Sequence, residues 1–163
     1  MKKLILISTI LGLIGCEMVE DSSQMSVSGT VPMTGAPHFE LKQYQIAGES
    51  LDDQMIFFDL NKNMISDADK EKLSQFARVV ASKPLRVRIE GHTDERGSAE
   101  YNIALGWRRA QSVAEYLQSQ GVDKKNIWLV SYGKEKPVVY GHNDTAWQMN
   151  RRSYVSLVSR GAS

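Results

Sequence analysis

The chain has 163 residues, of which 42% are hydrophobic and 24% charged, and these proportions exclude an integral membrane bundle and a wholly disordered polypeptide. Its formal net charge is +1, so it lacks the excess of positive charge that nucleic-acid binding requires, and we expect no nucleic-acid partner. It has one cysteine, which excludes an internal disulfide and any metal site built from several cysteines.

The N-terminal segment has the layout of a secretory signal peptide. Lys2 and Lys3 form a short basic region, and residues 4–15 form a mostly apolar stretch that ends in small residues. A helix of this length would span roughly 18 Å, too short for the ~30 Å hydrocarbon core of a bilayer. We therefore expect residues 1–15 to be a cleaved leader rather than a transmembrane helix.

The cysteine, Cys16, directly follows Leu13, Ile14 and Gly15. This segment resembles the lipobox of bacterial lipoproteins, which implies acylation of the Cys16 thiol and of the new amino terminus, with palmitate among the acyl chains. Several acyl chains on one residue give a stable membrane anchor. By the same resemblance, Glu17 in place of Asp implies sorting to the outer membrane of a Gram-negative bacterium, with the rest of the chain in the periplasm. The alternative is an unmodified cysteine.

A tether is expected after the lipidated residue. The chain from Glu17 to about Ser50 is rich in Ser, Thr, Gly and Pro and shows no sustained periodicity. This composition is typical of a flexible linker. We therefore predict a lipidated N-terminus and tether over residues 16–50 and one folded domain over residues 51–160.

Within residues 51–160, the apolar patterns predict alternating strands and helices. Strands are expected at residues 54–58, 85–90, 127–132 and 154–158. Helices are expected from Ser66 to a stop at Pro84, from Ser98 to about Gln120 before Gly121, and over residues 145–150. The order β-α-β-α-β-(α)-β predicts an α/β (α+β) two-layer sandwich with the helices packed on one face of the sheet.

A polar loop and the helix that follows it carry the candidate ligand-binding residues. Asp94 lies in the loop between Gly91 and Gly97, and Arg109 interrupts an apolar row of the helix. Such a carboxylate and guanidinium, facing one pocket, could hold a zwitterion, with an ammonium group on Asp94 and a carboxylate bound to Arg109 in bidentate fashion. The alternative is that Asp94 and Arg109 pair with each other and only fasten the loop to the helix.

Three segments, together with the lipobox, carry a family resemblance: residues 90–110, residues 130–137 and residues 150–152. They are similar to the OmpA-like domain family, in particular to its peptidoglycan-binding lipoproteins. The resemblance implies that Asp94 and Arg109 grip the diaminopimelate of the peptidoglycan stem peptide. It also implies supporting contacts from Asn102, Leu105, Arg96, Leu60 and Asn61. Many relatives have Phe and Asp where this chain has Leu60 and Asn61, and Asn brings no formal charge, so this departure bears on ligand affinity.

The resemblance implies a protein without catalytic activity or cofactor that links the outer membrane to the cell wall. It further implies membership in the Tol system, which maintains envelope integrity and supports cell division. TolB, with other Tol or OmpA-like envelope proteins, is then the expected protein partner. Two alternatives remain: an OmpA-like lipoprotein outside the Tol system, and a cell-wall hydrolase in which Asp94 and Glu95 act on peptidoglycan.

His92 and Asp94 alternate along one strand and therefore suggest a metal pair or an acid–base dyad. A third ligand at suitable spacing is not evident, because His38 lies in the expected tether and His142 in a distal loop. We therefore expect a structural histidine at position 92 and no metal site. Trp107 occupies a position that is usually polar in relatives, and we interpret it as a surface or partner-contact residue.

Overall fold

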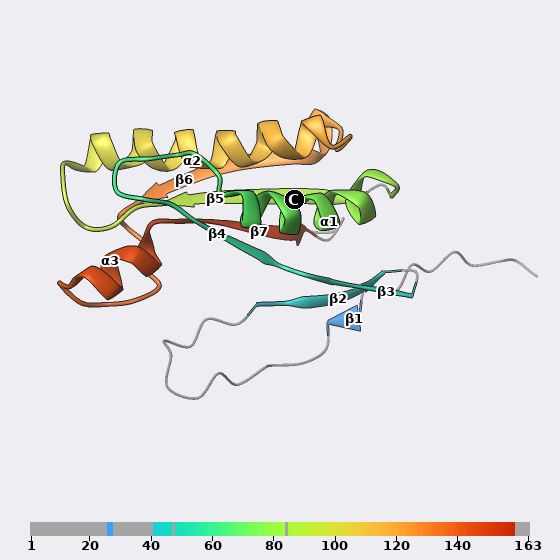
Figure 1. The fold of residues 1–163 in the computed structure, drawn as a ribbon, viewed down its shortest axis with the longest axis horizontal. Coiled ribbons are helices and arrows are strands. Elements are labelled where there is room, and N and C mark those ends of the chain that lie inside the picture. Colours follow the sequence, from blue (N-terminus) through green and yellow to red (C-terminus); the bar gives the residue numbers. More distant parts are fainter. Residues whose placement is uncertain (1–25, 28–40, 47, 84, 159–163) are drawn as a thin grey trace, which may run out of the picture.

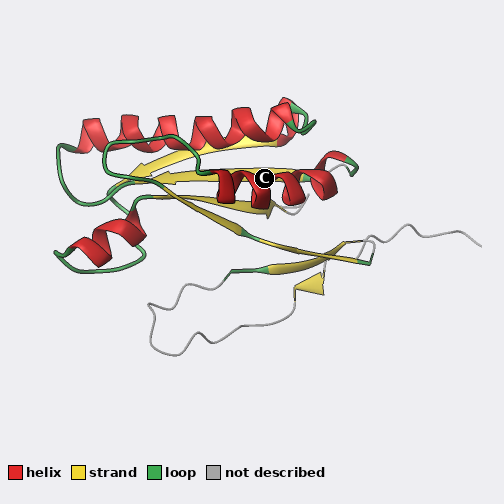
Figure 2. Ribbon diagram, in the orientation of Figure 1, coloured by secondary structure: helices red, strands yellow, loops and turns green. Residues whose placement is uncertain are grey.

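The chain folds into helices packed on one face of a mixed sheet (Figures 1 and 2). The computed structural model describes residues 26–27, 41–46, 48–83 and 85–158. In these residues the main sheet has the order β4-β7-β5-β6, with β5 and β6 parallel and β7 antiparallel to both β4 and β5. Its strands are β4 (Gln54–Phe57), β5 (Arg86–His92), β6 (Ile127–Gly133) and β7 (Arg152–Val158). The predicted fold class is confirmed.

Helices α1 (Asp67–Ala81) and α2 (Ala99–Ser119) cover that face of the sheet, and α3 (Asp144–Asn150) lies beyond one end of it (Figure 1). The side chains of Ser66 and Ser98 each accept a hydrogen bond from the backbone N–H three residues later, so each residue caps a helix at the start that the sequence predicts. Gly121 follows the end of α2 with φ 96°, a conformation that favours glycine. Pro84 lies outside the described residues.

The hydrophobic core lies between these helices and the sheet. Val87 and Ile89 of β5 are fully buried, whereas Arg86 is exposed, as the strict alternation in this segment predicts. The helices contribute their apolar stripes to the same core. The other fully buried apolar side chains include Ile56, Leu73, Val113, Leu117 and Val155.

Helix α2 approaches β5 closely because two glycines face each other. A Cβ atom on Gly91 would lie 1.8 Å from the carbonyl oxygen of Gly106, and one on Gly106 would lie 2.4 Å from Ser131 Oγ. Neither position therefore accepts a side chain without a shift of its surroundings. The close contact places the first half of α2, with Asn102 and Arg109, against the end of β5 where the polar loop begins.

A second, smaller sheet precedes the main one in the chain. It consists of β1 (Ser26–Val27), β2 (Gln43–Ile46) and β3 (Glu49–Asp52), paired antiparallel in that order. Tyr44 and Ile46 are buried with the main core, and the Tyr44 hydroxyl donates to the Leu157 carbonyl at 3.4 Å. The prediction that the tether extends to residue 50 is therefore wrong. Its last part contains β2 and the start of β3, and the alternate apolar residues of β2 contact the core.

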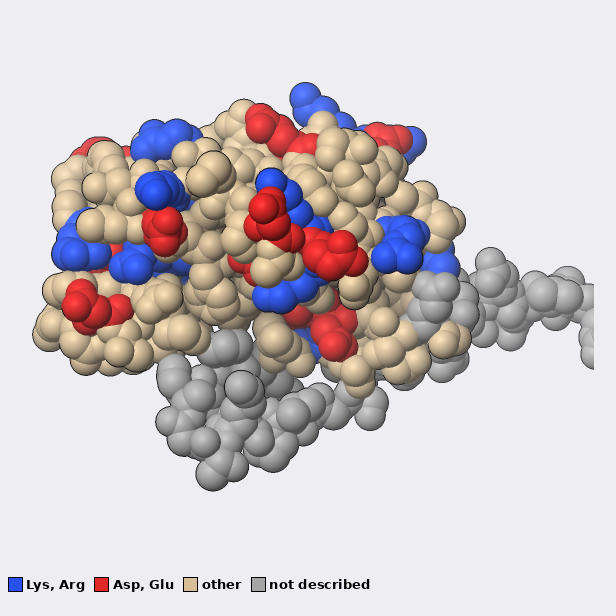
Figure 3. Space-filling model, in the orientation of Figure 1, with Lys and Arg blue, Asp and Glu red and all other residues tan. Residues whose placement is uncertain are grey.

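The expected leader, Cys16 and His38 lie outside the described residues and stay predictions. Among the described helices, none combines the length and the apolar character needed to cross a bilayer. On the face drawn in Figure 3, basic and acidic side chains are interspersed rather than gathered in patches of one sign. This pattern agrees with the near-zero net charge of the chain.

Candidate functional site

A small pocket lies beside the polar loop that follows β5. The turn after β4, the first half of α2 and the end of α3 supply its other walls. All seven residues predicted to contact ligand line it: Leu60, Asn61, Asp94, Arg96, Asn102, Leu105 and Arg109. Thr93 and Arg151 complete the lining. The cavity measures about 30 Å³, so in this conformation it admits the end of a ligand rather than a whole one.

Arg109 is fully buried and is held by backbone carbonyls. Its Nε donates to the carbonyl of Lys62 at 2.9 Å, and its Nη2 donates to that of Asp59 at 3.1 Å. Its Nη1 donates to the carbonyl of His92 at 2.8 Å. Because Asp59 and Lys62 flank Leu60 and Asn61, Arg109 fastens the turn that carries these two residues to the end of β5.

The arrangement of Arg109 leaves donors for a ligand. The three carbonyls use three of the five guanidinium N–H groups, which leaves one on each terminal nitrogen. Burial, with a contribution from the nearby charge of Arg151, lowers the pKa of Arg109 to about 10. The guanidinium therefore stays charged at neutral pH, with one N–H group on each terminal nitrogen that these carbonyls do not engage.

Asp94 is buried beside two other arginines. Arg96 donates to it three times, from Nη2 at 2.7 Å, from Nε at 3.2 Å and from its backbone N–H at 3.1 Å. Arg151 Nη1 lies 3.4 Å from Asp94 Oδ2. Burial alone would raise the pKa of Asp94, but the hydrogen bonds and charge of Arg96, with the weaker contact from Arg151, lower it overall. Asp94 is therefore an anion at neutral pH.

The structure does not show the alternative in which Asp94 and Arg109 pair with each other. The ion pairs of Asp94 are with Arg96 and Arg151, and the hydrogen bonds of Arg109 are with carbonyls. Both side chains nevertheless line the same pocket. The carboxylate and the guanidinium are thus presented separately to one space, as the zwitterion hypothesis requires.

The uncharged supporting residues shape the pocket. The Asn102 side chain donates to the carbonyl of Arg96 at 2.8 Å and to that of Ser98 at 3.0 Å, so it fixes the loop. Leu105 is buried and forms an apolar wall. Asn61 has φ 55°, a left-handed conformation that Asn tolerates better than most residues.

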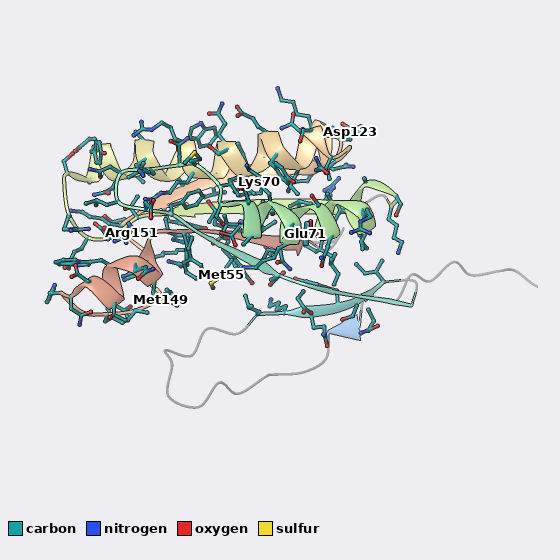
Figure 4. The ribbon with its side chains drawn as sticks, viewed as in Figure 1. Met55, Lys70, Glu71, Asp123, Met149 and Arg151 are labelled. Carbon is teal, nitrogen blue, oxygen red and sulfur yellow. The ribbon has the colours of Figure 1, made fainter. Side chains whose placement is uncertain are left out.

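Arg151 is the charged pocket residue that sequence reasoning missed. It lies where α3 passes into β7 (Figure 4), and its Nε donates to the carbonyl of Phe58 at 3.0 Å. The motif at residues 150–152 was a signal for it, but successive residues at a strand start point to opposite sides. Arg152, next in the chain, is buried away from the pocket and donates to the Lys136 carbonyl at 3.3 Å.

His92 does not join Asp94 in a metal pair. Its ring stacks on Tyr132 with 5.5 Å between centroids, and burial lowers its pKa, so it is neutral at neutral pH. In the part of the chain that the structure describes, no group of three or more His, Cys, Asp or Glu side chains is placed to hold a metal ion. Glu95 contacts Trp147 and His142 instead of facing Asp94, so the two carboxylates do not oppose each other across a substrate.

Trp107 lies on the outer side of α2 and is exposed, as predicted for a surface residue. Neighbouring Ala99, Ile103 and Ala104 make this part of α2 apolar. The expected partner contact of Trp107 stays a prediction.

The sequence and the fold are similar to those of known proteins. The family model described as "OmpA family" matches residues 57–151. The peptidoglycan-associated lipoprotein of Pseudomonas aeruginosa is 45% identical over 96 residues, which are 59% of this chain and 57% of that protein. The Legionella pneumophila protein of the same name is 60% identical over 67 residues, 41% of this chain and 38% of that one. The match thus spans 57% of the length of the first of these curated relatives and 38% of the second.

Two solved structures are also similar to this chain. The crystal structure of the peptidoglycan-associated lipoprotein from Burkholderia pseudomallei aligns with a TM-score of 0.63 and 39% identity, covering 64% of this chain and 90% of that one. The OmpA-like domain of FopA1 from Francisella tularensis aligns with a TM-score of 0.59 at 20% identity, covering 84% of this chain and 95% of that one, which shows a shared fold. Since the family model covers more than half of the sequence, the chain belongs to the OmpA family.

Proposed function

We propose that this chain is a peptidoglycan-associated lipoprotein whose folded domain binds the stem peptide of peptidoglycan without covalent chemistry. The observation that carries the proposal is the pocket in which Asp94 and Arg109 are presented separately to one cavity. The names of its relatives support the same assignment. Cys16, acylated, would anchor the protein in the outer membrane, so the domain would connect that membrane to the cell wall.

The proposed ligand group is diaminopimelate, whose free end carries a carboxylate and an ammonium on the same α-carbon. The carboxylate would accept the two N–H groups that Arg109 has free, and the ammonium would bind Asp94. Leu105 offers an apolar contact for the hydrocarbon chain. Asn61 can present its side-chain carbonyl to an ammonium, but without charge, so it would add less affinity than an aspartate.

Co-sedimentation of the purified protein with peptidoglycan sacculi tests this proposal. Asp94→Ala and Arg109→Ala should each leave most of the protein in the supernatant. Glu71→Ala and Lys70→Ala, which remove the same charges from α1 (Figure 4), should sediment like the wild type. Sedimentation of both pocket variants with wild-type efficiency would overturn the proposal. Release of soluble muropeptides would show a hydrolase instead.

We further infer that the protein acts in the Tol–Pal system, with TolB and other Tol or OmpA-like envelope proteins as partners, in envelope integrity and cell division. Family membership and the names of the relatives support this inference. Capture of TolB from solution by the purified protein is the expected result. Peptidoglycan binding without any capture of TolB would instead favour an OmpA-like anchor outside the Tol system.

Lipidation is tested separately from ligand binding. Incorporation of labelled palmitate is expected for the wild-type protein and is expected to be lost in Cys16→Ser, since Cys16 is the one cysteine in the chain. Labelling of Cys16→Ser at the wild-type level would remove the anchor from the proposal and leave the pocket untouched.

A further inference from the structure

An indole ring lies against the exposed arginine of the pocket. The Arg96 guanidinium carbon is 4.1 Å from the centre of the Trp147 ring, and the same guanidinium donates to Asp94 at 2.7 Å. Arg96 thus stacks on a side chain of α3 while it pairs with the buried carboxylate. Arginine has many rotamers, and a stacked aromatic face restricts them and attracts the cation.

The Trp147 ring is itself held in place by Glu95. Its Nε1 donates to Glu95 Oε1 at 2.8 Å, and His142 Nδ1 lies 2.8 Å from both oxygens of the same carboxylate. These hydrogen bonds lower the pKa of Glu95, that from His142 more than that from Trp147, so Glu95 accepts as an anion. Consecutive residues of the loop therefore have different partners: Asp94 lines the pocket and Glu95 contacts α3.

Helix α3 is fixed well enough to serve as a support. The Asn150 side chain accepts from the backbone N–H groups of Val138 and Val139 at 2.8 and 3.1 Å and donates to the carbonyl of Val139 at 2.7 Å. At its other end, the Asn143 side chain caps the helix. One turn after Trp147, Arg151 contacts Asp94 directly. Trp147 of α3 thus reaches Asp94 through Arg96, and Arg151, which directly follows α3, reaches Asp94 itself.

We propose that Trp147 is a positioning residue that holds Arg96 against Asp94, and that Glu95 orients Trp147 for this role through the indole N–H. This inference rests on the proposed function, because the pocket that Arg96 borders is the one proposed to bind the stem peptide. Trp147 acts through Arg96 and does not line the pocket itself. Trp147 thereby fixes the position of the Arg96 guanidinium at the edge of the pocket when ligand binds.

A double-mutant cycle tests the inference, with affinity measured for a soluble muramyl tripeptide that ends in diaminopimelate. Trp147→Ala should weaken binding roughly three- to tenfold, the range expected for loss of a stacked cation. In an Arg96→Ala background, Trp147→Ala should cause no further loss. Trp128→Ala is the matched control, because Trp128 also carries a stacked arginine, Arg86 at 5.0 Å, but lies on β6 away from the pocket. It should bind like the wild type.

Two further variants separate positioning from general support of the fold. Trp147→Phe keeps a ring for Arg96 but loses the donor to Glu95, so its affinity should lie between those of the wild type and Trp147→Ala. Glu95→Ala removes the acceptor for the indole N–H, so its affinity should also lie between those of the wild type and Trp147→Ala. An equal loss from Trp147→Ala with and without Arg96 would show a merely structural role and overturn the inference.

An NMR measurement without ligand keeps this inference distinguishable from the proposed function. The Nε–H signal of Arg96 should exchange slowly with water in the wild type and quickly in Trp147→Ala. Wild-type exchange in Trp147→Ala overturns the positioning role. If Asp94→Ala and Arg109→Ala both bind peptidoglycan normally, the proposed function fails, while the exchange result still decides whether Trp147 positions Arg96.

Discussion

Arg109 Nη1 donates a hydrogen bond of 2.8 Å to the backbone carbonyl of His92, which ties the middle of α2 to the end of β5. The same guanidinium reaches the turn after β4 through two more carbonyls. One buried side chain thus joins three segments that are far apart in the sequence. A substitution of Arg109 should therefore affect both ligand binding and stability, so both quantities have to be measured for each Arg109 variant.

Arg109→Ala should destabilise the protein strongly, because it leaves three carbonyls around an emptied space. We expect a loss of about 3–5 kcal/mol in the free energy of unfolding, measured by urea denaturation. Arg108→Ala, at the exposed neighbouring position, is the control and should change it by no more than about 0.5 kcal/mol. A similar small effect for both variants would contradict the structural role of Arg109.

Gly91→Ala should also be costly, since its Cβ would lie 1.8 Å from a backbone oxygen of α2. Overpacking of this kind costs about 1–3 kcal/mol or more, because α2 must move away from β5. Gly48→Ala is the matched control: no atom lies within 4 Å of its Cβ, and only its φ of 84° adds strain, about 1–2 kcal/mol. If Gly91→Ala were the milder of the two in thermal unfolding, the close contact would be wrong.

The pocket could be predicted from the sequence to the extent that its residues belong to one loop and one helix. Asp94 and Arg96 lie two residues apart, and Asn102, Leu105 and Arg109 share a helix face, so local periodicity groups them. Their actual partners could not be predicted. Arg109 bonds to carbonyls of residues 47 and 50 positions away, and such contacts depend on tertiary packing rather than on spacing.

The same limit explains the two misses. Whether Arg151 or Arg152 faces the pocket depends on where α3 ends, and helix ends are weakly encoded in sequence. Strand β2 is short and begins in a polar segment, so its sequence alone does not distinguish Tyr44 and Ile46 from scattered apolar residues. Their burial depends on the pairing of β2 with β3. Long elements with strict periodicity, such as α2 and β5, were predicted correctly because each carries its own pattern.

The N-terminal boundary of the fold gives a direct prediction. A chain that begins at residue 41 keeps Tyr44 and Ile46, whereas one that begins at residue 51 loses both from the core. Burial of each such side chain contributes about 1.5–3 kcal/mol, so the shorter chain should be less stable by several kcal/mol in urea denaturation. Equal stability of the two chains would show that residues 41–50 add nothing to the stability of the fold, as expected for a tether that extends to residue 50.

Acid should remove the stabilising contribution of Asp94. Its pKa is lowered in the folded protein, so its contribution is fully present above the unfolded value of about 3.9 and is lost as pH falls through the lower folded value. The difference in unfolding free energy between the wild type and Asp94→Asn should therefore shrink below about pH 4. A difference that stays constant from pH 7 to the acid limit of the titration would show that the Asp94 ion pairs contribute nothing.

The charge balance of the pocket predicts which ligand group matters most. Three arginines, Arg96, Arg109 and Arg151, line the pocket together with a single carboxylate, that of Asp94, so the lining is net positive. A ligand carboxylate should therefore contribute more than a ligand ammonium. One carboxylate of diaminopimelate shares its carbon with the free ammonium. Amidation of this carboxylate removes a charge-assisted contact of about 1.5–3 kcal/mol, so affinity should fall by at least about tenfold.

Isothermal titration with the free and amidated muramyl tripeptides measures this effect, and Arg109 provides the internal test. In Arg109→Lys, which keeps the charge but loses the bidentate donors, the two ligands should differ less than they do for the wild type. Arg108→Lys, at the exposed neighbouring position, should discriminate as the wild type does. Equal affinity of the wild type for both ligands would mean that Arg109 contacts no ligand carboxylate. Its role would then be limited to holding the turn through its hydrogen bonds to the carbonyls of Asp59 and Lys62.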